Sequence, residues 1–343
     1  MRRQSGRIAP AWLFVGALLL LAAIVTATFL LARRGAPLTT VEELRARYTT
    51  PASRFVDVAG VRVHYVDEGS GPVIVLFHGS FGSLRAFDEL AAPLREHYRV
   101  IRFDQAPGGL SGSVPAGFTL TPEAFTHAFL EQLGVRQAAL LGTSSGGIYA
   151  YRYAASYPQE VTALVLASVP PSAPVDNAGA QRRLPWRLRW SMMACQKYAK
   201  PWSRTCWEDF LSNTIARPEH RSAARIEQYY DMNRRADSRT MSSMTAIMRD
   251  DALVRDFLAR VRAPTLLIWG DLGNVLPPPT AATLAQRLSG TSVTTEFLQR
   301  VAHYPPMDAP EEVAAIVERF LGDHPPANAG GDDAAAAPAP GAP

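Results

Sequence analysis

Polar and apolar residues alternate along two neighbouring segments, Arg54–Val58 and Val61–Asp67, with Ala59-Gly60 between them. A period of two is typical of a β-strand with one buried face, and a short pair containing Gly is a common hairpin turn. The pattern therefore predicts an antiparallel β-hairpin.

Continuous apolar runs rich in β-branched residues follow, and stretches with helical periodicity separate most of them. Short runs of this kind are typical of strands buried on both faces. The predicted strands are Pro72–Phe77, Tyr98–Phe103, Ala138–Gly142, Val161–Ala167, Pro264–Trp269 and Val293–Leu298, and the predicted helices are Leu84–Arg95, Pro122–Leu133, Ser145–Ser156, Pro278–Leu288 and Pro310–Leu321. This alternation predicts an α/β fold with a mostly parallel, doubly wound sheet and helices on both faces.

The alternation is interrupted by residues 172–244, which show no strand pattern and are rich in Arg, Trp, Met and helix-forming residues. We expect this segment to be a helical cap, or lid, inserted between two parts of one core, residues 54–171 and 245–322. The final segment, residues 323–343, consists largely of Ala, Pro, Gly and Asp. It cannot bury a core, so we expect it to be disordered.

The longest apolar run comes before the globular part. Ile8–Leu31 contains no charged residue, and arginines flank it, three within the basic segment 1–10 and two at positions 33 and 34. A helix over residues 11–32 is about 33 Å long, which matches a bilayer core of roughly 30 Å. We expect a transmembrane anchor. A cleaved signal peptide is the alternative, but its apolar part usually spans only about 7–15 residues.

Because basic residues flank both ends of the predicted anchor, the positive-inside rule does not determine its orientation in the membrane. A single N-terminal span favours a protein of the inner, or cytoplasmic, membrane whose globular part lies outside the cytoplasm. The formal net charge is +4, from 35 basic and 31 acidic residues, and the five flanking arginines account for this excess. The rest of the chain is close to neutral, which argues against nucleic acid as a partner.

The segment Gly142–Gly147 reads Gly-Thr-Ser-Ser-Gly-Gly between a predicted strand and a predicted helix. This is the context of a nucleophile elbow, in which a tight turn lifts one serine hydroxyl above the sheet. The turn requires small residues two places before and after the nucleophile. Ser144 has Gly142 and Gly146 there, whereas Ser145 would have the bulkier Thr143, so Ser144 is the expected nucleophile. A Gly-rich turn without chemistry is the alternative.

Four motifs in this order resemble those of the α/β-hydrolase superfamily, and the resemblance covers roughly residues 54–321. Besides the elbow they are an oxyanion-type loop over Phe77–Gly82, a loop from Asp104 to Ser111, and a histidine segment, Ala302–Pro305. In the loop that begins at Asp104, the proline and the first glycine stand one place later than in the family pattern, so its conformation is expected to differ locally. The resemblance implies a serine hydrolase of the esterase or lipase type with the superfamily's fold.

His303 is the expected general base. A loop histidine just after the last strand lies above the carboxyl edge of the sheet, where the elbow also points. The resemblance implies that His78 holds the oxyanion loop and that the backbone N–H groups of Ser80 and Ser145 form the oxyanion hole. The other histidines have no such context; they are His64, His97, His127, His220 and His324.

The catalytic carboxylate is the least defined member of the site. Relatives place it three residues beyond the glycine of a Trp-Gly pair, and here Gly273 occupies that position after Trp269-Gly270. Asp271 lies two residues earlier, which is about 6–7 Å along an extended chain. We expect Asp271 to serve as the acid.

Other relatives take the acid from the end of the sixth strand, where this chain has Ser168 and, a few residues later, Asp176. The alternatives to Asp271 are therefore Asp176, Asn274 or no residue at all.

Trp and Leu interleave with Arg over Arg182–Trp190 in the expected cap. The segment from Asp176 to Thr240 contains 13 basic and seven acidic residues, so it carries a net positive charge. Apolar and cationic residues on one helix suit a membrane interface. We interpret this segment as a lid that contacts anionic lipid headgroups and favours acyl substrates with long apolar groups. An ordinary lid helix that packs its aromatic residues over the pocket is the alternative.

The two cysteines, Cys195 and Cys206, form no metal-binding pattern. The spacing leaves open one disulfide in an oxidising compartment or two buried thiols.

The expected activity is hydrolysis of a carboxylic ester or related acyl bond through an acyl-enzyme on Ser144. No metal or organic cofactor is implied. A serine nucleophile argues against haloalkane or epoxide hydrolysis, because those reactions need an alkyl ester on a carboxylate. The expected partners are a small-molecule or lipid acyl substrate and the membrane, while substrate identity and oligomeric state have no sequence signature. The alternatives are a binding protein that has lost turnover and an acyltransferase.

Overall fold

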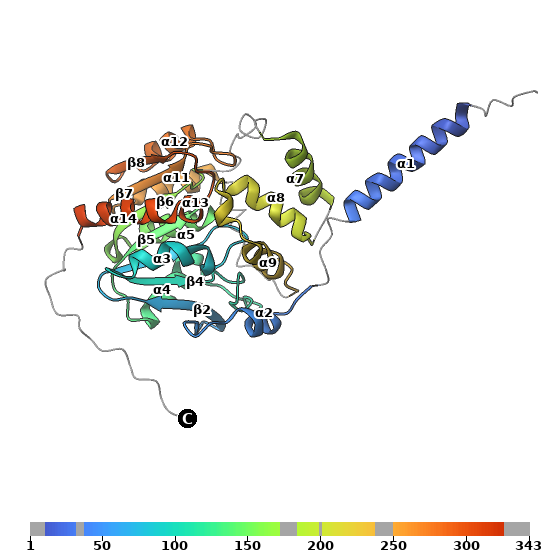
Figure 1. The fold of residues 1–343 in the computed structure, drawn as a ribbon. Helices are drawn as coiled ribbons and strands as arrows, with labels where there is room; N and C mark the ends of the chain where they lie inside the picture. Colours follow the sequence, from blue (N-terminus) through green and yellow to red (C-terminus); the bar gives the residue numbers. More distant parts are fainter. Residues whose placement is uncertain (1–10, 32–37, 172–183, 199–200, 237–249, 326–343) are drawn as a thin grey trace, which may run out of the picture.

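The structure, a computed structural model, describes residues 11–31, 38–171, 184–198, 201–236 and 250–325. The predicted basic flank 1–10, the predicted tail beyond residue 325 and Asp176 lie outside these residues. The described strands form one eight-stranded sheet in the order β1-β2-β4-β3-β5-β6-β7-β8 (Figure 1). They are β1 (Arg54–Val58), β2 (Val61–Glu68), β3 (Val73–Phe77), β4 (Arg99–Phe103), β5 (Ala138–Thr143), β6 (Val161–Ala167), β7 (Thr265–Gly270) and β8 (Val293–Leu298).

The sheet confirms the predicted architecture. β1 and β2 pair as an antiparallel hairpin at one edge, β2 is antiparallel to β4, and all remaining pairs are parallel. The parallel strands β5 and β7 are buried along their whole length, as their apolar sequences predict. Because β3, β5 and β7 are parallel, the loops at their carboxyl ends meet at the same edge of the sheet, which is where ligands bind in this type of sheet.

Helices cover both faces of the sheet and separate two apolar clusters. One cluster packs α4, α5, α11 and α12 against the sheet, and the other packs α3 and α14 against the opposite face. The core helices are η1 (Leu84–Phe87), α3 (Asp88–Leu94), α4 (Pro122–Gln132), α5 (Ser145–Ser156), η2 (Pro158–Glu160), α11 (Asp251–Arg260), α12 (Pro279–Arg287), α13 (Pro305–Asp308) and α14 (Pro310–Asp323).

The described residues between β6 and α11 contain no strand of the sheet. They form four helices, which we call the inserted helices: α7 (Trp186–Tyr198), α8 (Arg204–Thr214), η3 (Pro218–His220) and α9 (Ala223–Met232). Figure 1 shows α7, α8 and α9 together on one side of the sheet. A disulfide between Cys195 and Cys206 joins α7 to α8, which decides between the two alternatives left open for these cysteines.

Two helices precede the sheet. α1 (Ala11–Leu31) projects away from the globular part, and its window Phe14–Leu31 has a mean hydropathy of 2.6 and no buried residue, so it is long and apolar enough to cross a membrane. α2 (Val41–Tyr48) was not predicted, although Thr40 and Glu43 form a capping box at its start. α1 contacts α7, and Thr39, just before α2, forms an isolated β-bridge with Arg235, just after α9.

Candidate active site

Ser144 stands at a sharp turn between β5 and α5. Its backbone has φ 51° and ψ −126°, which is outside the regions that residues with a side chain ordinarily occupy. Non-glycine residues persist in such conformations only where the surrounding structure holds them, and these positions concentrate at functional sites. The turn leaves Ser144 partly accessible above a strand that is otherwise buried.

The glycines beside Ser144 are required by close contacts between backbone segments. A Cβ atom on Gly142 would lie 2.5 Å from the Cα of Gly147, and one on Gly146 would lie 2.1 Å from the carbonyl oxygen of Phe77. These distances are too short for any side chain. The two glycines whose spacing led us to expect a nucleophile elbow thus stand where backbone segments approach each other closely.

The imidazole of His303 faces the elbow. Its Nε2 atom lies 2.9 Å from Oγ of Ser144, which is within hydrogen-bonding distance. His303 follows β8 and precedes α13, so its loop lies at the carboxyl edge of the sheet. The structure thus places a potential base within reach of the serine hydroxyl, which is what activation of a serine requires.

The other nitrogen of His303, Nδ1, is buried and has no hydrogen-bond partner among the described residues. Burial lowers the pKa of His303 from 6.5 to about 3, because desolvation disfavours the charged imidazolium. In a complete triad a carboxylate accepts a hydrogen bond from this nitrogen and stabilises the imidazolium.

Asp271, the expected acid, does not fill this role by direct contact. Its Oδ1 accepts a hydrogen bond from the backbone N–H of Val301 at 3.2 Å, two residues before His303. Gly273, at the position where relatives carry the acid, has φ +45°, and a Cβ there would lie 2.6 Å from Cδ of Pro278. The loop after β7 therefore has a conformation at position 273 that leaves no room for a side chain. Asn274 donates to the backbone oxygen of Asn213 at 3.2 Å.

The carboxylate of Asp308 fixes the histidine loop, a role that the sequence did not predict. Asp308 is fully buried, and its two oxygens accept three backbone N–H groups, those of Ala302 at 2.6 Å, Ala216 at 2.9 Å and Arg217 at 2.8 Å. It links the residue before His303 to the inserted helices. Asp308 therefore positions the base and has no oxygen directed at its Nδ1.

The two residues expected at the oxyanion hole lie next to each other. Oγ of Ser80 donates to Oγ of Ser145 at 2.8 Å, and Tyr304 donates from its hydroxyl to the carbonyl oxygen of Ser80 at 3.3 Å. Gly79 allows close approach here, since a Cβ would lie 3.2 Å from Cβ of Ser144. The loop that follows β3 is thus in contact with the elbow.

His78 holds the start of this loop. Its Nε2 accepts the backbone N–H of Gln105 at 3.0 Å, and the side-chain amide of Gln105 donates to the carbonyl oxygen of His78 at 2.6 Å. Burial lowers the pKa of His78, so the ring stays neutral and can accept this bond. The contacts agree with the supporting role implied by the resemblance.

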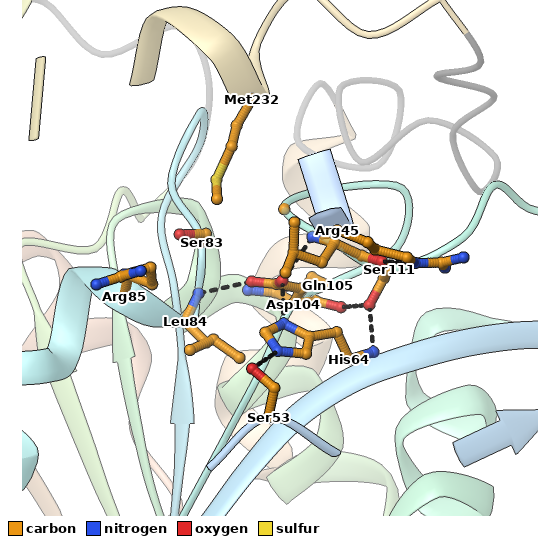
Figure 2. A network of polar contacts seen from close by, with 12 residues as sticks. Arg45, Ser53, His64, Ser83, Leu84, Arg85, Asp104, Gln105, Ser111 and Met232 are labelled. Atoms are coloured by element: carbon orange, nitrogen blue, oxygen red, sulfur yellow. Dashed lines mark hydrogen bonds and ion pairs between the residues drawn. The ribbon is translucent and has the colours of Figure 1, made fainter. Parts of the chain in front are cut away.

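A Ser–His–Asp chain lies elsewhere, beside the β1–β2 hairpin (Figure 2). Nδ1 of His64 is 2.7 Å from Oδ2 of Asp104, and its Nε2 is 2.8 Å from Oγ of Ser53. The Asp104 carboxylate also accepts the backbone N–H groups of Leu84 and Leu110, each at 2.7 Å. Because these contacts join three loops, we interpret the network as structural support for the loop that follows β4.

A cavity of about 740 Å³ lies between α7 and α8 and reaches the loops that follow β3 and β7. Phe81 of the oxyanion loop and Val275 of the loop after β7 both line it, and aromatic and Met side chains make up most of the wall. The lining residues are Phe81, Trp186, Arg189, Trp190, Met192, Met193, Gln196, Trp202, Phe210, Asn213 and Val275. Within the part of the chain that the structure describes, no group of three or more His, Cys, Asp or Glu side chains is arranged to hold a metal ion.

Comparison with known protein families gives a match to the alpha/beta hydrolase fold over residues 72–310. Haloalkane dehalogenase 2 of Mycobacterium tuberculosis is 27% identical over 296 residues, which cover 78% of this chain and 94% of that protein. A dihydrolipoyllysine-residue acetyltransferase component of the acetoin cleaving system of Cupriavidus necator is 34% identical over 141 residues. That match spans only 37% of this chain and 38% of the relative.

Solved structures show the same fold. A membrane phospholipase A described as a bacterial virulence factor superposes with a TM-score of 0.62 at 22% identity, covering 92% of this chain and 99% of the other. Naproxen esterase from Bacillus subtilis superposes with a TM-score of 0.63 at 18% identity, covering 82% and 95%. At these identities the likeness establishes architecture, and chemistry has to be argued from the site itself.

Proposed function

The chain belongs to the family of proteins with the alpha/beta hydrolase fold, and we propose that it is a serine esterase held at a membrane by α1. The observation that carries the proposal is the 2.9 Å distance between Nε2 of His303 and Oγ of Ser144, at an elbow with positive φ. Serine is a weak nucleophile unless a base takes its proton, and this geometry supplies the base.

The reaction proceeds by two acyl transfers. His303 accepts the proton of Ser144 at Nε2 while Oγ forms a bond to the ester carbonyl carbon, and the carbonyl oxygen becomes an oxyanion facing the backbone N–H groups of Ser80 and Ser145. The bond to the leaving alcohol then breaks, and the alcohol takes the proton from His303. Water repeats the sequence on the acyl-enzyme and releases the acid.

Ser144 separates this chain from relatives that hydrolyse carbon–halogen bonds. Haloalkane dehalogenation by this fold needs a carboxylate that forms an alkyl ester with the substrate, and a serine ether would not be hydrolysed by the same route. The dehalogenase-like relative therefore supports hydrolysis in general, while the nucleophile supports an acyl substrate.

Asp271 remains our proposed acid. Its carboxylate accepts the backbone N–H of Val301, two residues before His303, which ties it to the loop that carries the proposed base. Asp176 is the second candidate.

The inserted helices support an apolar acyl substrate and a membrane partner. Trp186 and Trp190 are one helical turn apart on α7 and are 65% and 61% exposed, and Arg187 and Arg189 lie between them. Both tryptophans line the cavity, and α7 contacts α1. We propose that α7 acts as a lid whose exposed tryptophans enter the lipid interface, with acyl chains reaching the cavity from that side.

The disulfide supports an orientation with the globular part outside the cytoplasm. Structural disulfides persist in oxidising compartments and are rare in the cytoplasm. Cys195 and Cys206 are both fully buried in their bond.

A series of p-nitrophenyl esters of increasing acyl length tests the activity. The full-length protein is expected to hydrolyse them, Ser144→Ala to lose at least about 10³-fold in kcat, and the neighbouring Ser145→Ala to keep most of it. Equal losses in the two variants would contradict the assignment of the nucleophile.

A catalytically inactive binding protein is the second candidate, and the buried Nδ1 of His303 without a partner among the described residues favours it. Folded wild-type protein that binds esters in the cavity without turnover would support this reading.

A further inference from the structure

The oxyanion loop contains a residue in an unfavourable backbone conformation. Phe81, directly after Ser80, has φ +64°, in the left-handed region that residues with a Cβ rarely adopt. Such a conformation is unfavourable and is maintained only by surrounding contacts. Ser80 directly precedes this turn, so the orientation of its backbone depends on how the turn at Phe81 is held.

The contacts that hold Phe81 come from the inserted helices. The side-chain amide of Asn233, at the end of α9, donates a hydrogen bond to the carbonyl oxygen of Phe81 at 2.9 Å. The Phe81 ring packs against Trp202, Trp207 and Phe210, with ring centroids 5.6–5.7 Å away. The backbone and the ring of Phe81 are thus both held by α8, α9 and their connections.

The end of α9 is in turn held by α2, the helix that follows α1. Asp231 is fully buried, and its carboxylate accepts hydrogen bonds from Tyr48 at 2.7 Å and from Arg47. The backbone of Thr39 pairs with this segment as well, accepting the N–H of Ala236 and donating to the carbonyl of Arg234, each at 2.9 Å. Asp231 stands two residues before Asn233, so α2 fixes the position from which Asn233 reaches Phe81.

We propose that Asn233 is a positioning residue for the oxyanion hole and that α2 keeps it in place through Asp231. The proposal rests on the proposed esterase function. It makes the oxyanion-hole geometry depend on the segment next to the membrane anchor, through a continuous set of contacts from Tyr48 to Asp231 to Asn233 to Phe81. Displacing α2 therefore weakens stabilisation of the tetrahedral intermediate without altering Ser144 or His303.

Asn233→Asp is the sharpest variant, because it keeps the size of the side chain and removes the donor. We expect kcat to fall by about 10- to 100-fold with KM nearly unchanged, the size of effect that small misplacements of catalytic groups produce. Affinity for a boronic acid, which forms a tetrahedral adduct on the serine, should fall by a similar factor. Asn233 also donates to the carbonyl of Tyr229, so the melting temperature is measured alongside.

Ser212→Ala is the matched control. It removes a hydrogen bond of the inserted helices, the one from Arg221 to Oγ of Ser212 at 2.8 Å, without touching the oxyanion loop. Wild-type kcat is expected for this variant. A similar fall in both variants, or an unchanged kcat in Asn233→Asp, would overturn the proposal.

The contribution of α2 is tested by Tyr48→Phe, alone and combined with Asn233→Asp. Tyr48→Phe alone should lower kcat by a smaller factor than Asn233→Asp does. Added to Asn233→Asp, it should have no further effect, because Asn233 then no longer holds the loop. Independent, multiplicative effects would contradict the coupling.

Hydrogen exchange of the peptide covering residues 78–84 separates this inference from the proposed function. Exchange there should rise in Asn233→Asp even if the wild-type protein shows no turnover. Absence of turnover would contradict only the esterase assignment. Unchanged exchange would sink the positioning role, whatever the activity.

Discussion

Nε2 of His303 lies 2.9 Å from Oγ of Ser144, although 159 residues separate the two in the chain. The opposite nitrogen of the same ring is buried and has no hydrogen-bond partner among the described residues. The proposed nucleophile is therefore in contact with its proposed base, while direct support for the charged form of that base is not present in the described part of the chain. This asymmetry determines how the enzyme should respond to pH and to loss of each carboxylate.

The acid limb of the pH–rate profile should be displaced to low pH. His303 acts as a base only when neutral, and burial lowers its pKa to about 3, so kcat/KM should stay constant as the pH falls from neutrality almost to that value. The measurement is kcat/KM on a soluble ester in a series of buffers, with intact fold checked by circular dichroism. A limb centred near the ordinary imidazole pKa of 6.5 would show that a carboxylate pairs with Nδ1.

Removing the proposed acid should cost far more than removing its rival. Asp271→Ala is expected to lower kcat on the order of 10²-fold, less than the ~10⁴-fold reported for an acid bonded directly to its histidine. Asp176→Ala should retain nearly full activity. Steady-state kinetics of both variants decide the matter, and equal activities, or a larger loss in Asp176→Ala, would refute the assignment of Asp271.

Placing the acid where relatives carry it should fail to improve this enzyme. Gly273→Asp introduces a Cβ 2.6 Å from Pro278 at a position with φ +45°, so the loop must shift. We expect a loss of about 1–3 kcal/mol in the free energy of unfolding and no gain in kcat. Thermal unfolding of this variant and of Gly273→Ala should give similar destabilisation. A rise in kcat would mean that the loop accepts a carboxylate there.

The sheet could be predicted from the sequence because most of its strands are short apolar runs, a pattern that can be recognised without knowing which segments pack against them. The boundaries of β1, β6 and β8 were predicted without error, and α5 was predicted from Ser145 to Ser156. That Ser144 and His303 lie close together could also be predicted, because each follows a strand and is marked by a local pattern. α11 and α2 went unpredicted; α2 has a capping box at its start, but it is short and buries only two residues, Val41 and Leu44.

The supporting contacts could not be predicted, because they depend on segments far apart in the chain. Asp308 accepts N–H groups from residues about 90 positions earlier, and His64 joins Asp104 across 40 positions. His64 had no context in the sequence that distinguished it from a surface histidine. The replacement of the family's acid by Gly273 was visible in the sequence, but the direction of the Asp271 carboxylate depends on how this loop folds.

The disulfide should contribute about 2–3 kcal/mol to stability, since it closes a short loop between Cys195 and Cys206. Reduction, or replacement of both cysteines by Ser, should lower the melting temperature. In cells, a thiol-reactive reagent should label the denatured protein only after reduction. Labelling without reduction would place the globular part in the cytoplasm.

Exposed tryptophans on α7 should matter for lipid substrates only. Replacing Trp186 and Trp190 by Ser is expected to lower hydrolysis of a lipid ester in anionic nanodiscs on the order of 10-fold, with little effect on a short soluble ester. Phe297→Ser is the matched control, because Phe297 is 48% exposed on β8, at the opposite edge of the sheet from β1. Equal hydrolysis in anionic and neutral nanodiscs would rule out an interfacial role for the basic residues of α7.

The most direct test of the account is the site and rate of covalent labelling by a fluorophosphonate, mapped by mass spectrometry of the digested protein. The account predicts a single adduct on Ser144, formed at least about 10²-fold more slowly in His303→Ala because the serine then has no base. An adduct on Ser145, or a labelling rate that is the same with and without His303, would contradict it.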